Sequence, residues 1–514
     1  MKNKKYKNAL KFIPLAAILT LILSLLFACG GDSGGNDTGD KNLPADDGKS
    51  SGQADDSKTQ DEEDRILPDL PEANYDGHEF KILTFGVQGS EEWEQIDLTV
   101  KEEDAGDVVS DAVYRRNAAV EGKYNISLKE VHIYDSEFGN AIKKDFGAGT
   151  NEYDLISPRV VDSAGYMQSG YFLNLFNPAV EYLDLSKPWY NQQAIKEMSI
   201  DNKLFIVLSD VLLSDNNATC ITLFNKKIIQ DHGLGDMYSL VREGKWTVDK
   251  LYEYSKVTAR DLNSDGKMTP AEDRFGYLIW GDAMITYLHS AGQRLVSKDE
   301  NDLPVLSFND AKTYEAMEKV MDLLYDENVT GNVQKDVFDN WSKIAFQDIF
   351  SSGRAAFGWC RLFMVPNLRG MDDDFGILPI PKIYESSDTN YHSTVNVHTS
   401  CALAIPAVCK DTDRTTIIME ALAAESKYTI QPAYYDIALY RKHSRDEDSR
   451  EMLDIILSNR VLDIGDVYNF AEFGIEFYRR AKDNDRSLVA FYEKYESKVN
   501  KEIDKLIGRI QDLP

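Results

Sequence analysis

The sequence predicts an α/β protein of two lobes, and two observations lead to this fold class. Segments with strand character alternate with segments of helical periodicity, which is typical of α/β folds with a largely parallel sheet. About 440 residues follow a polar N-terminal segment, which is more than one simple core usually holds and favours two lobes.

The first part of the chain shows the alternation most clearly. It predicts a strand at 79–85, a helix at 107–123, a strand at 125–131, a helix near 137–147 and a buried strand at 153–157. The middle is richer in helix. Thr247 is expected to cap a helix over 248–260, and 309–327 has a strong helical period, while 205–208, 274–279 and the segment from Ala355 have strand character.

The first thirty residues have the pattern of an export signal. Five lysines precede an apolar stretch from Phe12 to Ala28, which ends at Cys29 followed by two glycines. This ending resembles a bacterial lipobox, which implies that Cys29 becomes the first mature residue and carries the lipid. The alternative is an uncleaved membrane anchor, for which the apolar stretch is slightly short. Both alternatives place the remaining chain outside the cytoplasm, held at the outer face of the membrane.

Residues 30–74 are expected to form an acidic tether. Gly, Ser, Asp and Gln dominate most of this segment, which offers little apolar surface to bury and should remain disordered. The formal net charge of the chain is −29. This acidity argues against nucleic acid as a partner, because nucleic acid requires a positive surface. The charge is compatible with a neutral ligand.

The cysteines do not predict a metal centre. Apart from Cys29 they are Cys220, Cys360, Cys401 and Cys409, with no C-x-x-C pair, and the histidines form no H-E-x-x-H motif. Four buried thiols are favoured, and a Cys401–Cys409 bridge remains open in an exported protein.

Residues 261–272 fit the calcium-loop pattern D-x-[DN]-x-[DN]-G-x5-E without a gap. A calcium loop needs oxygen ligands at these spacings and a glycine for the sharp turn, which Gly266 provides. Pro270 and the strand that follows argue against a second helix of an EF-hand, so a single structural Ca2+ loop is expected. The alternative is a metal-free turn. The expected ligands are Asp261, Asn263, Asp265, Lys267, Thr269 and Glu272.

A set of short strings, in order along the chain, resembles family 1 extracellular solute-binding proteins, the relatives of maltose-binding protein. No single string identifies the family, but the whole set in this order is specific for it. The strings lie at 152–156, 164–175, 201–208, 223–227, 245–251, 353–357, 376–382 and 402–406.

This resemblance implies two hinged lobes of the periplasmic-binding-protein-like type II fold, with the ligand cleft between them. The first lobe is expected at about 75–209 plus 402–445, and the second at about 210–401 plus 446–514. It also implies a small-molecule ligand and the permease of an ABC importer as partners. We expect the chain to be a monomer without catalytic residues.

Sugars require flat aromatic faces for their C–H patches and planar polar groups for their hydroxyls. Both kinds of residue occur where the resemblance places the cleft, mostly directly after strands. For each of them a core or capping role is the alternative, and Pro158 makes the loop after 153–157 depart from the family pattern. The candidates are Arg159, Asp162, Asp210, Asp215, Trp280, Trp359, Arg361, Phe363, Asn396, His398, Tyr435 and Tyr468.

The resemblance therefore predicts a lipoprotein that captures a carbohydrate, most simply an oligosaccharide, for an ABC importer. Two alternatives stay open. One is a subunit that senses a ligand for a membrane signalling protein, which would share the fold and the cleft. The other is a surface glycoside hydrolase, which requires two carboxyl groups at a fixed separation, and no local motif identifies such a pair.

Overall fold

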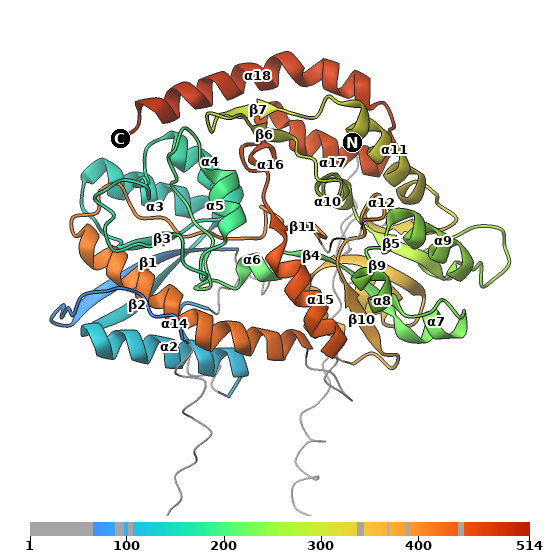
Figure 1. Ribbon diagram of the computed structural model, residues 1–514, viewed down its shortest axis with the longest axis horizontal. Helices are drawn as coiled ribbons and strands as arrows, with labels where there is room; N and C mark the ends of the chain where they lie inside the picture. The colour runs from blue at the N-terminus through green and yellow to red at the C-terminus, as the bar shows by residue number, and fades with distance from the viewer. Residues whose placement is uncertain are drawn as a thin grey trace, which may run out of the picture. The chain divides into compact units, whose positions relative to one another are not determined.

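A computed structural model describes residues 65–87, 97–100, 106–336, 344–368, 370–386, 388, 390–439 and 447–514 (Figure 1). Residues Asp64–Pro514 form one compact unit. Cys29 and most of the predicted tether lie outside the described residues.

The N-terminal part folds around a parallel three-stranded sheet in the order β2-β1-β3. β1 is buried at almost every position from Phe80 onward, because helices α2 and α14 pack beside it and α3 covers it. Asp107 caps α2 by accepting hydrogen bonds from the backbone N–H groups of Val109 and Ser110, each at 3.1 Å. The elements up to the first crossing between the lobes are β1 (His78–Gly86), α2 (Val108–Tyr124), β2 (Ile126–Tyr134), α3 (Asp135–Ala148), β3 (Leu155–Ser157), α4 (Val160–Gln168) and α5 (Gln192–Met198).

Extended segments widen this first sheet without forming regular strands. Ile156 bridges Ala404, and Val207 bridges Leu403, both in antiparallel sense. The prediction of a regular strand at 205–208 is therefore wrong: the segment is extended but makes only isolated bridges. Its partner segment, 402–406, follows the second lobe in the sequence. This pairing therefore brings the chain back to the first lobe.

The second lobe is built on a mixed five-stranded sheet in the order β10-β4-β9-β5-β8. β9, β5 and β8 run parallel to one another, whereas β4 is antiparallel to both β9 and β10. The carboxyl ends of β5 and β9 therefore lie at the same edge of the sheet. The elements are α6 (Ser214–Asn217), β4 (Cys220–Asn225), α7 (Lys226–Asp231), α8 (Met237–Arg242), α9 (Val248–Thr258), β5 (Phe275–Ile279), α10 (Ala283–Ser290), β6 (Val296–Lys298), β7 (Pro304–Leu306), α11 (Ala311–Leu324), β8 (Thr330–Asn332), α12 (Val333–Asp336), the π-helix η4 (Ile344–Phe350), β9 (Ala355–Arg361), the 3-10 helix η5 (Leu362–Leu368) and β10 (Phe375–Leu378).

The remaining elements begin at the second crossing. They are β11 (Ser393–Thr394), α14 (Thr412–Leu439), α15 (Glu447–Ser458), β12 (Arg460–Val461), α16 (Ile464–Tyr468), the 3-10 helix η6 (Phe470–Glu472), α17 (Phe473–Asp483) and α18 (Leu488–Asp512). β12 returns beside β11 in a parallel pair, so a third segment joins the junction between the two sheets.

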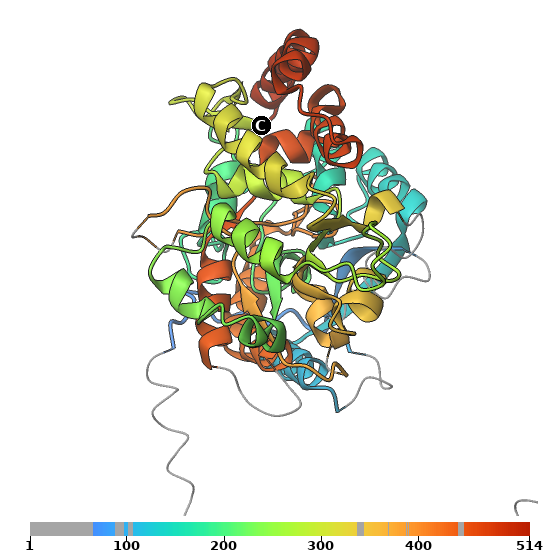
Figure 2. The same cartoon turned by 90° about the vertical axis from the view of Figure 1, so that its right-hand side faces the viewer.

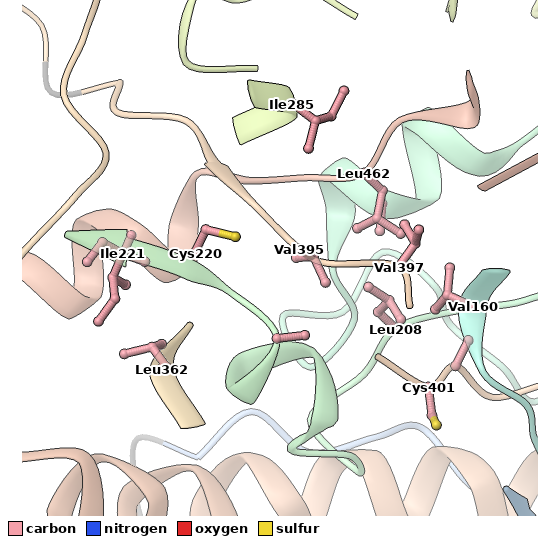
Figure 3. Packing of buried hydrophobic residues seen from close by; sticks show 14 of the residues in the cluster. Val160, Leu208, Cys220, Ile221, Ile285, Leu362, Val395, Val397, Cys401 and Leu462 are labelled. Atoms are coloured by element: carbon pink, nitrogen blue, oxygen red, sulfur yellow. The ribbon is translucent and has the colours of Figure 1, made fainter. Parts of the chain in front are cut away.

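The hydrophobic core is continuous across this junction. Figure 3 shows Val160 and Leu208, which belong to the first lobe, close to Val397 of the second crossing and Leu462 after β12. All four side chains are at most 3 % exposed. The crossing segments are therefore packed between the lobes instead of hanging as free linkers.

Helix α18 contacts both lobes. It packs against β7 and η6 on one side and against α4 on the other, and it lies at the top of both views (Figures 1 and 2). The ammonium group of Lys203 donates hydrogen bonds to the carbonyls of Ile510 and Gln511 at 3.0 and 3.2 Å. The C-terminus is thereby tied to the first lobe.

The predicted helices and strands are otherwise confirmed with small shifts at their ends. The helix predicted at 248–260 runs over Val248–Thr258, and Thr247 caps it by accepting from Lys250 N at 3.2 Å. The helix predicted at 309–327 is shorter, at Ala311–Leu324, because Asp310 begins it as the cap. None of the four described cysteines forms a disulfide, so the Cys401–Cys409 bridge does not occur in this structure.

Candidate ligand cleft between the lobes

Charged side chains from both lobes surround His398 in the second crossing. From the first lobe, Arg159 directly precedes α4 and lies two residues after the end of β3. Its Nε and Nη2 donate to the two carboxylate oxygens of Asp162 at 2.7 and 3.0 Å, and its guanidinium lies over the ring of Phe85 at 4.8 Å. These contacts hold the guanidinium in one orientation at the carboxyl end of the sheet.

The second lobe contributes groups from the carboxyl ends of β5 and β9. Asp282 lies three residues after β5, and Arg361 is the last residue of β9. The guanidinium of Arg361 is buried and lies 4.6 Å from the centre of the Phe363 ring, which is partly exposed. Because ligands of α/β sheets bind at the carboxyl ends of strands, this edge is the expected place for a site.

The second crossing connects these two sets of side chains. Asn396 donates from Nδ2 to Asp282 Oδ2 at 2.9 Å, and its Oδ1 accepts from the backbone N–H of His398 at the same distance. Burial lowers the pKa of His398; the charges of Arg159 and Arg361 lower it further, while those of Asp282 and Asp162 oppose the shift. His398 is therefore a neutral imidazole near pH 7, able both to donate and to accept a hydrogen bond.

Helices α16 and α17 complete the cluster. The hydroxyl of Tyr478 donates to Asp466, and the Tyr478 ring meets the His398 ring edge to face at 6.2 Å. Burial raises the pKa of Asp466 to about 7; the charges of Asp463 and Asp282 add to this, and the Tyr478 hydrogen bond opposes it. Asp466 consequently changes charge near neutral pH.

Three members of this cluster were missed from the sequence. Asp282 follows Trp280 by two residues, so the rule that polar groups gather after strands could have identified it. Asp466 and Tyr478 lie on short and amphipathic helices far along the chain, and no local pattern distinguishes them from core or surface residues. Only the packing of α16 and α17 beside the crossing brings them to His398.

The two predicted tryptophans lie beside the cleft edge but within the core. Trp280 and Trp359 are 0 % exposed and pack edge to face, with their ring centres 4.5 Å apart. Trp280 also meets Phe346 at 5.8 Å. In this arrangement protein groups cover both indoles, and a stacking role for either ring stays a prediction. Phe363 is the aromatic candidate beside Arg361 that is partly exposed.

The remaining candidates lie apart from the His398 cluster. Asp215 is buried and forms an ion pair with Arg460 at 2.6 Å. Asp210 and Tyr435 line a separate pocket beside the first crossing. Tyr468 ends α16, stacks on Phe470 at 5.5 Å and points its hydroxyl at the sulfur of Met167 on α4, at 3.9 Å. Its contact therefore joins the lobes.

The predicted calcium loop forms the expected turn. Gly266 has φ +78°, and its N–H donates to Asp261 Oδ2 at 2.8 Å, while Asn263 Oδ1 accepts from Asp265 N at 2.9 Å. Glu272 accepts from the Asn263 amide at 2.8 Å. The oxygen donors suit Ca2+ chemically, but no group of three or more acidic, histidine or cysteine side chains gathers for a metal within the part of the chain that the structure describes.

One further residue closes this loop. Asp273, directly after the motif, is fully buried and accepts from the backbone N–H groups of Leu262 and Thr269 at 2.9 and 2.7 Å. Asp273, which the calcium pattern does not include, thus fastens the base of the loop.

Two α/β lobes, crossing segments between them and a cluster of charged side chains at strand ends are the features of a two-lobed binding protein. The chain belongs to the bacterial extracellular solute-binding protein family, whose model matches residues 116–414.

Solved structures have the same fold at low sequence identity. An ABC substrate-binding protein from Listeria monocytogenes in complex with cycloalternan aligns with a TM-score of 0.53 and 13% identity, covering 84% of this chain and 100% of that one. A sugar transporter protein from Rhizobium etli in an open conformation gives 0.53 and 13%, with 85% and 99% covered. A cyclo/maltodextrin-binding protein complexed with maltotetraose gives 0.51 and 12%, with 85% and 97% covered.

A search of curated proteins finds no match to this chain. Among the described residues, no helix combines the length and the apolar character needed to cross a membrane.

Proposed function

We propose that the protein captures an oligosaccharide in the cleft around His398 and delivers it to an ABC permease, with the lipid on Cys29 as its membrane anchor. The observation that carries the proposal is the meeting of groups from both lobes at the second crossing. Asn396 in this crossing bonds the backbone of His398 and the carboxylate of Asp282, each at 2.9 Å, and the charges of Arg159, Asp162 and Arg361 act on the His398 ring. Guanidinium and carboxylate groups are planar, and they pair well with neighbouring hydroxyls of a sugar ring.

The composition of the cleft favours a neutral ligand. Arg159 is already paired with Asp162, and Asp282 and Arg361 carry opposite charges, so the four charges of the cluster sum to zero before a ligand arrives. The partly exposed Phe363 ring provides an apolar face for sugar C–H groups. The oligosaccharides in the complexes of the Listeria protein and the cyclo/maltodextrin-binding protein belong to the same chemical class.

We infer transport without catalysis. A ligand that contacts both lobes favours the closed form, and a permease that recognises this form needs only a difference in affinity. The family and the structural neighbours are transport binding proteins. A sensor role uses the same cleft, and a pull-down of the membrane partner distinguishes the two.

The test is calorimetric titration of the protein with linear and cyclic glucans and with plant oligosaccharides, followed by chromatography for products. Saturable binding without products is expected. Arg361→Lys keeps the charge but loses the planar fork, so it should weaken binding about tenfold or more. Arg354→Lys, just before the start of the same strand, should leave affinity unchanged. Product formation, or no binding to any glycan, would overturn the proposal.

We also propose that the 261–272 loop binds Ca2+ as a structural ion, in line with its oxygen donors and their spacing. Calcium binds only the folded loop, so it should raise the melting temperature of the protein. Glu272→Gln should abolish this rise, because the pattern requires the two carboxylate oxygens of a glutamate at this position, whereas Asp231→Asn, an exposed aspartate on α7, should not. An unchanged melting temperature with and without calcium counts against the proposal.

A further inference from the structure

A pocket of about 600 Å³ lies beside the first crossing and shares no residue with the His398 cluster. Asp210, in the crossing itself, forms part of its wall. Lys427 and Tyr435 reach it from α14, which packs on α2 of the first lobe, and Ile455 reaches it from α15, which packs on β10 of the second. We call this cavity the hinge pocket, because groups of both lobes and of a crossing line it.

The charged side chains that line the hinge pocket sum to zero: Lys427 and Arg460 are positive, and Asp210 and Asp454 are negative. Lys427 Nζ lies 3.6 Å from Asp210 Oδ2, and Arg460 pairs at 2.6 Å with Asp215, which is buried outside the lining. An anionic ligand would have to displace Lys427 or Arg460 from its carboxylate. A neutral hydroxyl can instead accept from Lys427 and donate to Asp210 while both ions stay together.

Apolar surface accompanies these polar groups. Tyr435, Ile455 and Leu457 are half-buried and line the same cavity. Tyr190 lines it too, but this residue is only 3 % exposed and its hydroxyl donates to Glu420 at 2.6 Å, so it contributes little accessible surface. Aromatic and aliphatic surface with a few fixed polar groups is the composition of small-molecule pockets of ~300–1,000 Å³.

We propose that the hinge pocket is a second ligand site, for a neutral mono- or disaccharide. It is separate from the cleft, and the proposal does not rest on the oligosaccharide assignment of the cleft. Because its wall comes from both lobes and from the crossing at Asp210, a bound sugar contacts groups that shift relative to one another when the lobes move. Occupancy of the pocket therefore biases the arrangement of the lobes.

The experiment is calorimetric titration of the whole extracellular chain with D-glucose, D-galactose, D-mannose, D-xylose and maltose. At least one of these sugars should bind saturably. Lys427→Met should weaken this binding about tenfold or more, the effect of one lost charge-assisted hydrogen bond. Lys505→Met, an exposed lysine on α18, should leave it unchanged. Asp210→Asn, which keeps the shape of the side chain, is the second pocket variant, and thermal unfolding checks that both fold.

The cleft variant separates the two sites. In Arg361→Lys the affinity for the small sugar should persist, whereas the affinity for a cleft oligosaccharide should fall about tenfold or more. Binding that disappears in Arg361→Lys but survives Lys427→Met and Asp210→Asn would overturn the second site. No binding to any of the five sugars, or binding of glycine in their place, would overturn it as well.

Discussion

Single residues in this protein carry protons that their types would normally release. Glu420 on α14 is 1 % exposed and accepts from Trp189 Nε1 at 3.2 Å and from the Tyr190 hydroxyl at 2.6 Å. Burial raises its pKa from 4.5 to about 7, and the Tyr190 hydrogen bond opposes the shift. The buried side chains of Trp189 and Tyr190 are thus both bonded to one buried acid.

This shift predicts how stability depends on pH. Between about pH 4.5 and 7 the folded protein keeps a proton that the unfolded chain has released, so the free energy of unfolding falls as pH rises through this window. The full effect is of the order of 3 kcal/mol, at about 1.4 kcal/mol per pKa unit. The melting temperature of Glu420→Gln should therefore fall less between pH 5 and pH 8 than that of the unmodified protein. Glu493→Gln, exposed on α18, serves as the control; an equal pH dependence in both variants contradicts the prediction.

Backbone strain at one residue gives a second prediction. Ala471, between α16 and α17, has φ +51°, a left-handed conformation that costs about 1 kcal/mol for a residue with a Cβ. Ala471→Gly should raise the stability by about this amount, because glycine adopts the conformation without a clash. Ala490→Gly, in the regular helix α18, should lower it by about 1 kcal/mol. Denaturant titration of both variants measures the two signs, and a destabilised Ala471→Gly would refute the argument.

At the scale of elements, the long C-terminal helix α18 is attached to the second lobe through its buried face. Its inner face buries Phe491, whose ring stacks on Phe473 at 4.6 Å and packs near Phe308 and Phe477. The helical period of this segment places an apolar residue on this face at nearly every turn. The aromatic cluster therefore attaches the C-terminal helices to the second lobe.

Truncation of this ring should destabilise the protein strongly. Phe491→Ala removes a buried aromatic side chain and leaves a cavity, which costs about 3–5 kcal/mol. Val489→Ala on the same helix changes a side chain that is 54 % exposed and should have little effect. Thermal and denaturant unfolding compare the two. Similar losses for both variants would show that α18 contributes little through its buried face.

At the scale of the whole molecule, the lobes are joined by more than their crossings. Glu197 of α5 accepts from Arg294 at 2.6 Å and from the backbone of Leu462 at 2.8 Å. Lys203 holds the C-terminal end of α18. Together with the continuous core at the junction, these contacts predict that the two lobes unfold together.

Scanning calorimetry should consequently show one transition for the unmodified protein. The double variant Glu197→Gln/Lys203→Met removes contacts between the lobes and should broaden this transition or split it into two. The matched double variant Glu243→Gln/Lys245→Met removes an exposed pair within one lobe and should leave a single transition. Two separate transitions in the unmodified protein would show that the crossings and the junction core do not couple the lobes.

The sequence by itself determined the local elements and the family. Apolar periodicity and caps such as Asp107 and Thr247 act over one or two turns, so β1, α2, β2, α3 and α9 were predicted close to their true ends. The ordered strings identified the family because they cover most of the folded chain, and the family model confirms it.

The tertiary structure decided which of the candidate residues meet. Arg159, Asp162, Arg361, Asn396 and His398 converge because three separate segments end at one junction. Asp210 and Tyr435 instead face the hinge pocket. The reason is physical: strand ends and cap residues are encoded locally, whereas the side of a crossing that a residue faces depends on how both lobes pack around it. The same holds for Asp466 and Tyr478, which only the packing of α16 and α17 brings to the cleft.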